Sequence, residues 1–76
     1  MHGMNGRFLQ VDGPKLRRLR RERAWSLREL GRRSGIAYDT INKLENEQRK
    51  AQLRTIRKLA EALDVEPKEL MKGEEE

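Results

Sequence analysis

The most regular hydrophobic pattern in the chain lies between residues 53 and 63. Apolar side chains recur there at intervals of three and four residues, at Leu53, Ile56, Leu59, Ala60 and Leu63. This spacing places side chains on one face of an α-helix, whereas a half-buried strand would need strict alternation. We therefore predict an amphipathic helix over residues 53–63 whose apolar face closes the core.

Two shorter helical patterns precede it and meet at Gly35. The first is predicted to span Leu27–Ser34, because Ser26 suits the N-cap and Glu29 completes a capping-box pattern three residues later. Glycine adopts positive φ without steric cost, so Gly35 suits a steep corner between two helices. Gly31 has no side chain to hold the following helix away. Together these features predict a helix-turn-helix.

The second of these helices is expected to start near Ala37 and to reach Glu45. Its apolar residues share one face that must be buried, and they are Ile36, Ile41 and Leu44. The opposite face carries four side chains that can hydrogen-bond outward, and these are Tyr38, Asp39, Asn42 and Lys43. We take this face as the candidate recognition surface. Alanine offers no capping acceptor, so Asp39 has an alternative role in bonding the free N–H groups of the first turn.

The first helix is predicted to open at Asp12-Gly13-Pro14, because aspartate suits the cap and proline suits the first turn. Leu16 and Leu19 then point inward, and Val11 lies where it would form a hydrophobic staple with Leu16. Trp25 ends the connection that follows. As the one tryptophan of a small core, it is expected to pack beneath the next helix.

A last short helix is predicted to begin at Glu66-Pro67 and to end near Lys72. Leu70 would point inward, and Gly73 would stop the helix. Met71 either faces solvent, where it offers a dimer contact, or covers the core. The pattern as a whole predicts an all-α domain of five helices.

The helical patterns divide the chain into three parts. Residues 1–10 include Gly3 and Gly6 and show no helical period, so we expect a flexible N-terminal arm. Residues 11–72 form the helix-turn-helix domain, and residues 73–76 form a loose acidic tail. For the arm there is an alternative, in which Phe8, Leu9 and Val11 fix it to the body or pair with a second chain.

Composition narrows the class of protein. The 76 residues suffice for one domain, and a hydrophobic content of 34% with only 4% aromatic residues favours helices over strands. The chain has no cysteine, which excludes disulfides and thiolate metal sites, and its single histidine, His2, has no neighbouring ligands. No apolar run approaches the ~20 residues of a membrane span, and no signal-peptide pattern is present. We expect a cytoplasmic protein without a cofactor or metal.

Positive charge is concentrated in the first half of the chain. The formal net charge is +5, and between Lys15 and Arg33 nine basic residues face only Glu22 and Glu29. Acidic residues dominate after Glu61. One basic end indicates a polyanionic partner, although such residues can also simply solvate a small helical domain.

Taken in order, several segments resemble the lambda-repressor and Cro-like helix-turn-helix family, also called the XRE family. The matching segments are Lys15–Arg23, Trp25-Ser26 ahead of Leu30, Gly35-Ile36, Ile41–Glu45, Thr55–Leu63 and Val65–Leu70. The resemblance extends from Val11 to Met71 and therefore covers nearly the whole chain. It implies a compact five-helix domain that binds double-stranded DNA and places the helix beginning near Ala37 in the major groove.

The resemblance also implies a role for individual residues. Arg20 borders the buried face of the first helix and would form a structural ion pair with Glu45. Base edges would be read by Tyr38, Asp39, Asn42 and Lys43. Asparagine can pair with adenine, lysine can donate to guanine, and aspartate can accept from cytosine. Tyrosine can touch a thymine methyl or a phosphate. The residues expected at DNA phosphates are Ser26, Arg28, Thr40, Asn46, Arg49 and Lys50.

The chain departs from the family pattern at four places. Leu27 stands where many members have a phosphate-binding glutamine, and Ala37 stands where they have a capping serine or threonine. Glu47 replaces the usual glycine of the loop, and Ala51-Gln52 replaces proline and serine. These departures indicate two weakly capped helices and an altered loop.

The sequence therefore predicts a sequence-specific DNA-binding transcriptional regulator, a repressor of the Cro/C1 type that binds a pseudo-palindromic operator as a homodimer. An alternative is an interaction protein, an antitoxin of the same fold that binds a toxin and autoregulates its operon. An enzyme is disfavoured, because the chain has no cysteine, one terminal histidine and carboxylates only at surface or capping positions.

Overall fold

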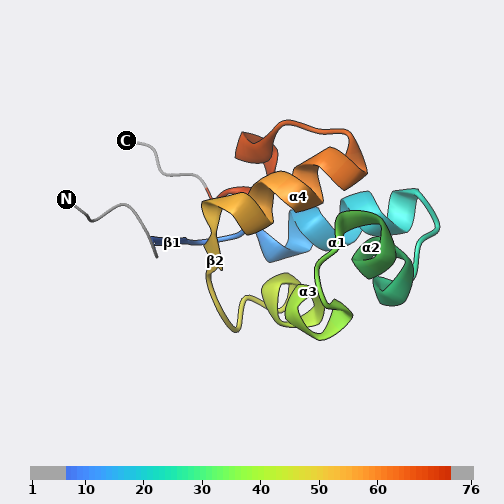
Figure 1. Ribbon diagram of the computed structural model, residues 1–76, viewed down its shortest axis with the longest axis horizontal. Coiled ribbons are helices and arrows are strands. Elements are labelled where there is room, and N and C mark those ends of the chain that lie inside the picture. The colour runs from blue at the N-terminus through green and yellow to red at the C-terminus, as the bar shows by residue number, and fades with distance from the viewer. Residues whose placement is uncertain (1–6, 73–76) are drawn as a thin grey trace.

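The computed structural model describes residues 7–72 as a small helical body (Figure 1). Its elements in chain order are β1 (Phe8–Leu9), α1 (Gly13–Glu22), α2 (Leu27–Ser34), α3 (Tyr38–Glu45), β2 (Ala51–Gln52), α4 (Leu53–Leu63) and the 3-10 helix η1 (Pro67–Leu70). In the view of Figure 1, α4 and α3 lie on opposite sides of α1. No helix in residues 7–72 has the length and apolar character needed to cross a membrane.

The core is formed by the apolar faces that the periodicity predicted. In α4, Ile56, Leu59 and Leu63 are fully buried, and Ala60 is nearly so. The inward position predicted for Leu53 is wrong, because this side chain remains 39% exposed. Leu53 is the first residue of α4 and lies at the edge of its apolar face, so neighbouring helices cover it only in part.

The fifth predicted helix is wrong in type and length, since the region described has four α-helices and one 3-10 turn, η1. After η1 the backbone becomes extended at Met71, with φ −96° and ψ 139°. The reason is a pairing with the start of the chain: Asp12 N donates to Leu70 O at 2.8 Å, and Lys72 N donates to Gln10 O at 3.0 Å. Met71 is therefore half-buried against the core opposite Val11. Of the two positions predicted for Met71, it has the one in which it covers the core.

The two short strands were not predicted. Phe8 pairs with Gln52 and Leu9 with Ala51 in an antiparallel arrangement. A pair of two-residue strands has no alternating run that sequence analysis can detect, and it depends on contacts between distant segments. Leu9 packs on the core while Phe8 remains exposed. The rest of the expected arm, residues 1–6, and the expected tail, residues 73–76, lie outside the residues described.

The first helix begins as its sequence predicts. The side chain of Asp12 caps α1 by accepting from Lys15 N at 3.2 Å. Val11 and Leu16 are both buried, as a hydrophobic staple requires. Trp25, at the following connection, packs against the core and is covered by the Arg33 guanidinium at 4.3 Å from its ring.

The helix-turn-helix has the predicted boundaries of α2. Ser26 caps α2 by accepting from Glu29 N at 3.0 Å, and Gly35 ends it in the left-handed conformation with φ 77°. A Cβ on Gly31 would lie 2.9 Å from Ile36 O, which confirms the close approach of the next segment.

The capping-box pattern at Ser26 is only half realised. The Glu29 carboxylate turns along the helix to Arg32 and Arg33, and these hydrogen bonds lower its pKa. Charged donors one turn away compete successfully with the backbone N–H of the cap.

Candidate nucleic-acid interface

Helix α3 presents the predicted outward face. Ile41 and Leu44 are fully buried beneath the helix. On the other side Tyr38, Asp39, Asn42 and Lys43 are exposed, and Thr40 between them is half-exposed. Tyr38 is 44% exposed, which is unusual for a large aromatic side chain that a small core would otherwise bury. The helix thus offers polar and aromatic groups to a partner on one side only.

Asp39 does not have the capping role offered as an alternative. Ala37 is the N-cap of α3, and within residues 7–72 no side-chain cap hydrogen bond is made there. The Asp39 carboxylate instead lies 3.5 Å from Lys43 Nζ, one turn along the helix. Both side chains are well exposed, so this pair is weak and can exchange for contacts to a partner.

A contact between Arg28 and Tyr38 joins the starts of α2 and α3. The Arg28 guanidinium lies 4.4 Å from the centre of the Tyr38 ring, and its Nη2 donates to the Tyr38 hydroxyl at 3.4 Å. The sequence indicated separate roles for the two residues, a phosphate contact for Arg28 and a base contact for Tyr38, and gave no sign of the stacking. Because the guanidinium is held on the ring face, its remaining N–H groups are available to an anion beside α3.

The expected ion pair between Arg20 and Glu45 links α1 to the last residue of α3, on the buried side of that helix. Arg20 Nε donates to Glu45 Oε2 at 2.6 Å and Nη2 donates to Oε1 at 2.9 Å, while Nη1 donates to Trp25 O at 2.9 Å. The Glu45 side chain is only 1% exposed. Hydrogen bonding to Glu45 raises the pKa of Arg20 above its ordinary value, so the guanidinium stays charged. This bidentate pair holds the end of α3 on α1.

A second arginine of α1 is linked to the exposed face of α3 through Asn46, which is the C-cap of α3. Arg17 Nε donates to Glu45 Oε1 at 3.3 Å, and its Nη2 donates to Asn46 Oδ1 at 2.6 Å. Asn46 Nδ2 in turn donates to Asn42 Oδ1 at 3.3 Å. Asn42 and Asn46 were predicted at DNA, but the chain of bonds from Arg17 was not.

The loop after α3 is fixed by Glu47. Its backbone has φ 55°, the left-handed region that the usual glycine would occupy freely. The carboxylate compensates by tying distant segments together, because Oε2 accepts from Gly13 N at 3.0 Å and from Lys72 Nζ at 2.7 Å. The Lys72 ammonium, and after it the Gly13 N–H, lowers the pKa of Glu47.

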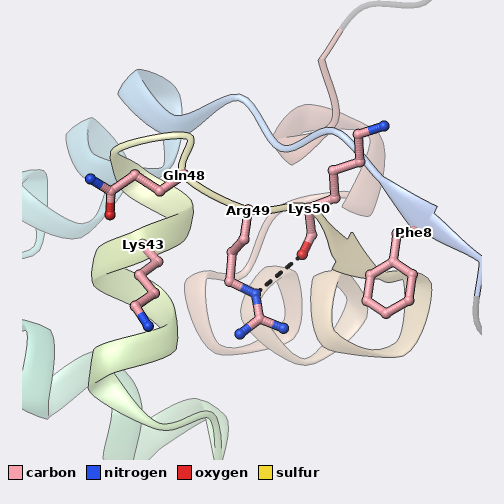
Figure 2. A pocket seen from close by; sticks show the side chains of 5 residues that line it. All are labelled: Phe8, Lys43, Gln48, Arg49 and Lys50. Carbon is pink, nitrogen blue, oxygen red and sulfur yellow. Dashed lines mark hydrogen bonds between the residues drawn. The ribbon is translucent and has the colours of Figure 1, made fainter.

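Beyond this loop, an open cleft of about 600 Å³ lies next to the C-terminal part of α3 (Figure 2). Its lining residues come from α3, the loop and β1, and they are Phe8, Lys43, Gln48, Arg49 and Lys50. Figure 2 shows the Phe8 ring and the Lys43 and Arg49 side chains directed to the same side, and Arg49 Nε donates to Lys50 O at 3.4 Å. Phe8 was not predicted as part of this basic surface.

The predicted site residues thus form connected pairs around α3: Arg28 with Tyr38, Asp39 with Lys43, and Asn42 with Asn46. Arg49 and Lys50 share the cleft with Lys43. Ser26 uses its hydroxyl as the α2 cap. Within residues 7–72, Thr40 has no hydrogen bond or ion pair to the others.

A helix-turn-helix family model, HTH_3, matches residues 16–70, which is most of the chain. The chain belongs to the HTH_3 helix-turn-helix family. It is a DNA-binding transcriptional regulator of the XRE, or Cro/C1, type. A comparison with curated proteins gave no match.

Solved structures agree with the HTH_3 assignment. The restriction-modification controller protein C.AhdI from Aeromonas hydrophila is 41% identical, with a TM-score of 0.74 over 78% of this chain and 89% of that one. An HTH_3 family transcriptional regulator from Vibrio cholerae is 21% identical, with a TM-score of 0.72 over 76% of this chain, which spans 33% of the regulator.

Streptomyces albus HEPD, solved with 2-hydroxyethylphosphonate and Fe(II), contains a similar fold. It is 30% identical, with a TM-score of 0.72 over 88% of this chain. The match covers only 15% of the HEPD chain, so it shows a shared helical fold and does not extend the chemistry of that protein to this HTH_3 chain.

The Glu47 contacts of this HTH_3 chain lead to a prediction about pH. Replacing Glu47 with glutamine is expected to lower the melting temperature at neutral pH, because the ion pair with Lys72 is lost. Glu47 has a lowered pKa in the folded state, so its contribution is present above the unfolded-state pKa and is lost as pH falls through the folded-state value. Thermal unfolding of both proteins from pH 7 to about pH 2 should therefore show two converging curves. A difference that stays constant with pH would contradict this role.

Proposed function

We propose that the chain reads an operator half-site in double-stranded DNA by placing α3 in the major groove. The observation that carries the proposal is the division of α3 into a buried face, with Ile41 and Leu44, and an exposed face rich in hydrogen-bonding groups. A major groove admits one α-helix, and each base pair there presents a distinct pattern of donors and acceptors. Asn42 and Lys43 are the proposed principal readers.

Contacts to phosphates supply most of the binding energy in this proposal and fix the register of α3. Arg28, stacked on Tyr38, contacts one strand near the start of α2, where N–H groups also favour an anion. Arg49 and Lys50 contact the backbone at the other end of α3, beside Phe8. Ser26, Thr40 and Asn46 complete the proposed set.

The chain is proposed to act as a homodimer on a pseudo-palindromic operator, with half-sites about 34 Å apart, and to repress transcription there. Two copies place two α3 helices in successive major grooves on one side of the duplex. The 41% identity to C.AhdI, a restriction-modification controller protein, supports the role of a controller protein of that kind for this chain.

The test is selection of bound sites from a random duplex pool at two salt concentrations. An inverted repeat whose affinity falls steeply with salt is the expected result, because each neutralised phosphate releases counterions. Binding that depends on salt but not on sequence would refute operator reading. The antitoxin-type interaction protein would then become the better interpretation, and purification with a stable toxin partner would support it.

Replacing Asn42 with alanine is expected to relax the preference at one or two base positions, at a cost of about 1–3 kcal/mol on the selected site. Binding to random DNA should change little, because Asn42 is uncharged and contacts no phosphate in this proposal. Lys50→Ala is the matched control and should weaken both DNAs alike and reduce the slope of the salt dependence by about 1. Equal losses on both DNAs for Asn42→Ala would make Asn42 a backbone contact instead.

A further inference from the structure

We propose that Asn46 and Arg17 determine base specificity by fixing which end of the Asn42 amide faces the DNA. Asn46 is thus a positioning residue, acting through Asn42, and it need not touch a base itself. The proposal rests on the proposed function, in which Asn42 reads the major groove. It assigns to α1 a part in discrimination between bases, through the Arg17 side chain, which is bonded to Asn46.

The orientation is set at Arg17, because a guanidinium can only donate hydrogen bonds. Its Nε is bonded to Glu45 Oε1 at 3.3 Å, and the Glu45 side chain is 1% exposed, so the anchor of Arg17 is buried. The group that faces Arg17 Nη2 at 2.6 Å must be an acceptor, and it is the amide oxygen of Asn46. The reverse orientation would bring two N–H donors together.

The same constraint passes from Asn46 to Asn42. With Oδ1 of Asn46 bonded to Arg17, its Nδ2 is the branch that donates to Asn42 Oδ1 at 3.3 Å. The two residues lie one turn apart on α3, with Asn46 as the C-cap, so their side chains meet on the same face. Asn42 Oδ1 therefore faces Asn46, and Asn42 Nδ2 is directed away from it.

An asparagine held this way offers DNA a donor. Guanine presents N7 and O6 as acceptors in the major groove, and thymine presents O4. Bidentate pairing with adenine requires the amide oxygen and the NH2 group to face the same base, and in this chain the oxygen is directed at Asn46. At the position contacted by Asn42, we therefore expect guanine or thymine over cytosine, whose exocyclic amine is a donor.

We call the chain of hydrogen bonds from Arg17 through Asn46 to Asn42 the relay. The substitution Asn46→Asp tests the proposal, because it reverses the second of these hydrogen bonds with almost no change in side-chain shape. An aspartate has only acceptors, so one oxygen keeps Arg17 and the other must accept from Asn42. Asn42 then turns its NH2 group inward and presents Oδ1 to the DNA. The expected preference moves to bases that donate, cytosine N4 or adenine N6, with a change of about tenfold in the ratio of affinities.

The experiment measures binding to four duplexes that differ only at the base pair mapped by Asn42→Ala. Gln48→Glu is the matched control, since it makes the same amide-to-acid change in the exposed loop, outside the relay. It should lower affinity for all four duplexes equally. Arg17→Met removes the anchor and should flatten the preference at this position without reversing it.

The outcomes separate the relay from the proposed function. A sharp wild-type profile that Asn46→Asp and Arg17→Met both leave unchanged overturns the relay and leaves operator reading intact. A wild-type protein that does not discriminate at any position overturns operator reading, and the relay with it. If Asn46→Asp fails to fold, Arg17→Met decides alone, because a retained wild-type preference in that variant overturns the relay.

Discussion

Replacing Arg20 with alanine is expected to lower the free energy of unfolding by about 3–5 kcal/mol. The substitution leaves the Glu45 carboxylate, 1% exposed, without its two shortest hydrogen bonds, at 2.6 and 2.9 Å. For a domain of this size such a loss lowers the melting temperature by at least about 12 °C, which thermal unfolding followed by circular dichroism will measure. An unchanged melting temperature would remove the Arg20–Glu45 pair as the element that holds α3 on α1.

Two further variants identify the cause of the loss. Arg17 also contacts Glu45, but its side chain is 38% exposed and its bond is longer, so Arg17→Met should cost less than about 1 kcal/mol. Replacing both partners, as Arg20→Met with Glu45→Leu, should recover much of the stability, because no buried charge is left unpaired. If the double variant is as unstable as Arg20→Ala, lost packing is the cause.

Replacing Gly13 with alanine is expected to destabilise the protein by about 3 kcal/mol. A Cβ at this position would lie 2.3 Å from the backbone oxygen of Glu45 and 2.8 Å from Glu47 Cγ. Backbone cannot rotate away as a long side chain can, so α1 and the end of α3 must separate. Specific DNA binding should fall more than stability alone explains, because the displaced segment carries Asn46 and the basic loop.

Gly35→Ala provides the comparison, because its cost has a different origin. Apart from its chain neighbours, no atom of the described residues 7–72 lies within 4 Å of a Cβ there, but φ is +77°, so the expected penalty is only about 1–2 kcal/mol of backbone strain. Chemical denaturation of both variants gives the two free energies directly. If Gly13→Ala is the milder substitution, the approach of α1 to α3 is looser than the structure shows.

The sequence was informative where a structural feature depends on neighbouring residues. The caps at Asp12 and Ser26, the left-handed Gly35 and the buried face of α3 all follow from patterns within a turn or two of helix. The Arg20–Glu45 pair joins residues 25 positions apart. Periodicity indicated only that Arg20 needs an acceptor, and the family resemblance identified which one.

Features that depend on distant segments were not predictable from the pattern. Arg17 and Asn46 are 29 positions apart, and Gly13 and Glu47 are 34 apart, so nothing local signals that they meet. Glu47 is the instructive example. As a departure from the family glycine it indicated a changed loop, but the structure retains the left-handed backbone and uses the carboxylate to bridge α1 and Lys72.

The pairing of Gln10 with Lys72 also determines how copies of this protein can be joined. The chain enters and leaves the helical body at adjacent points, since Lys72 N bonds Gln10 O at 3.0 Å. A linker from one copy to the next would leave and return on this same edge. In a single-chain tandem, the length of that linker would set the effective concentration of one copy beside the other without altering α3 in either copy.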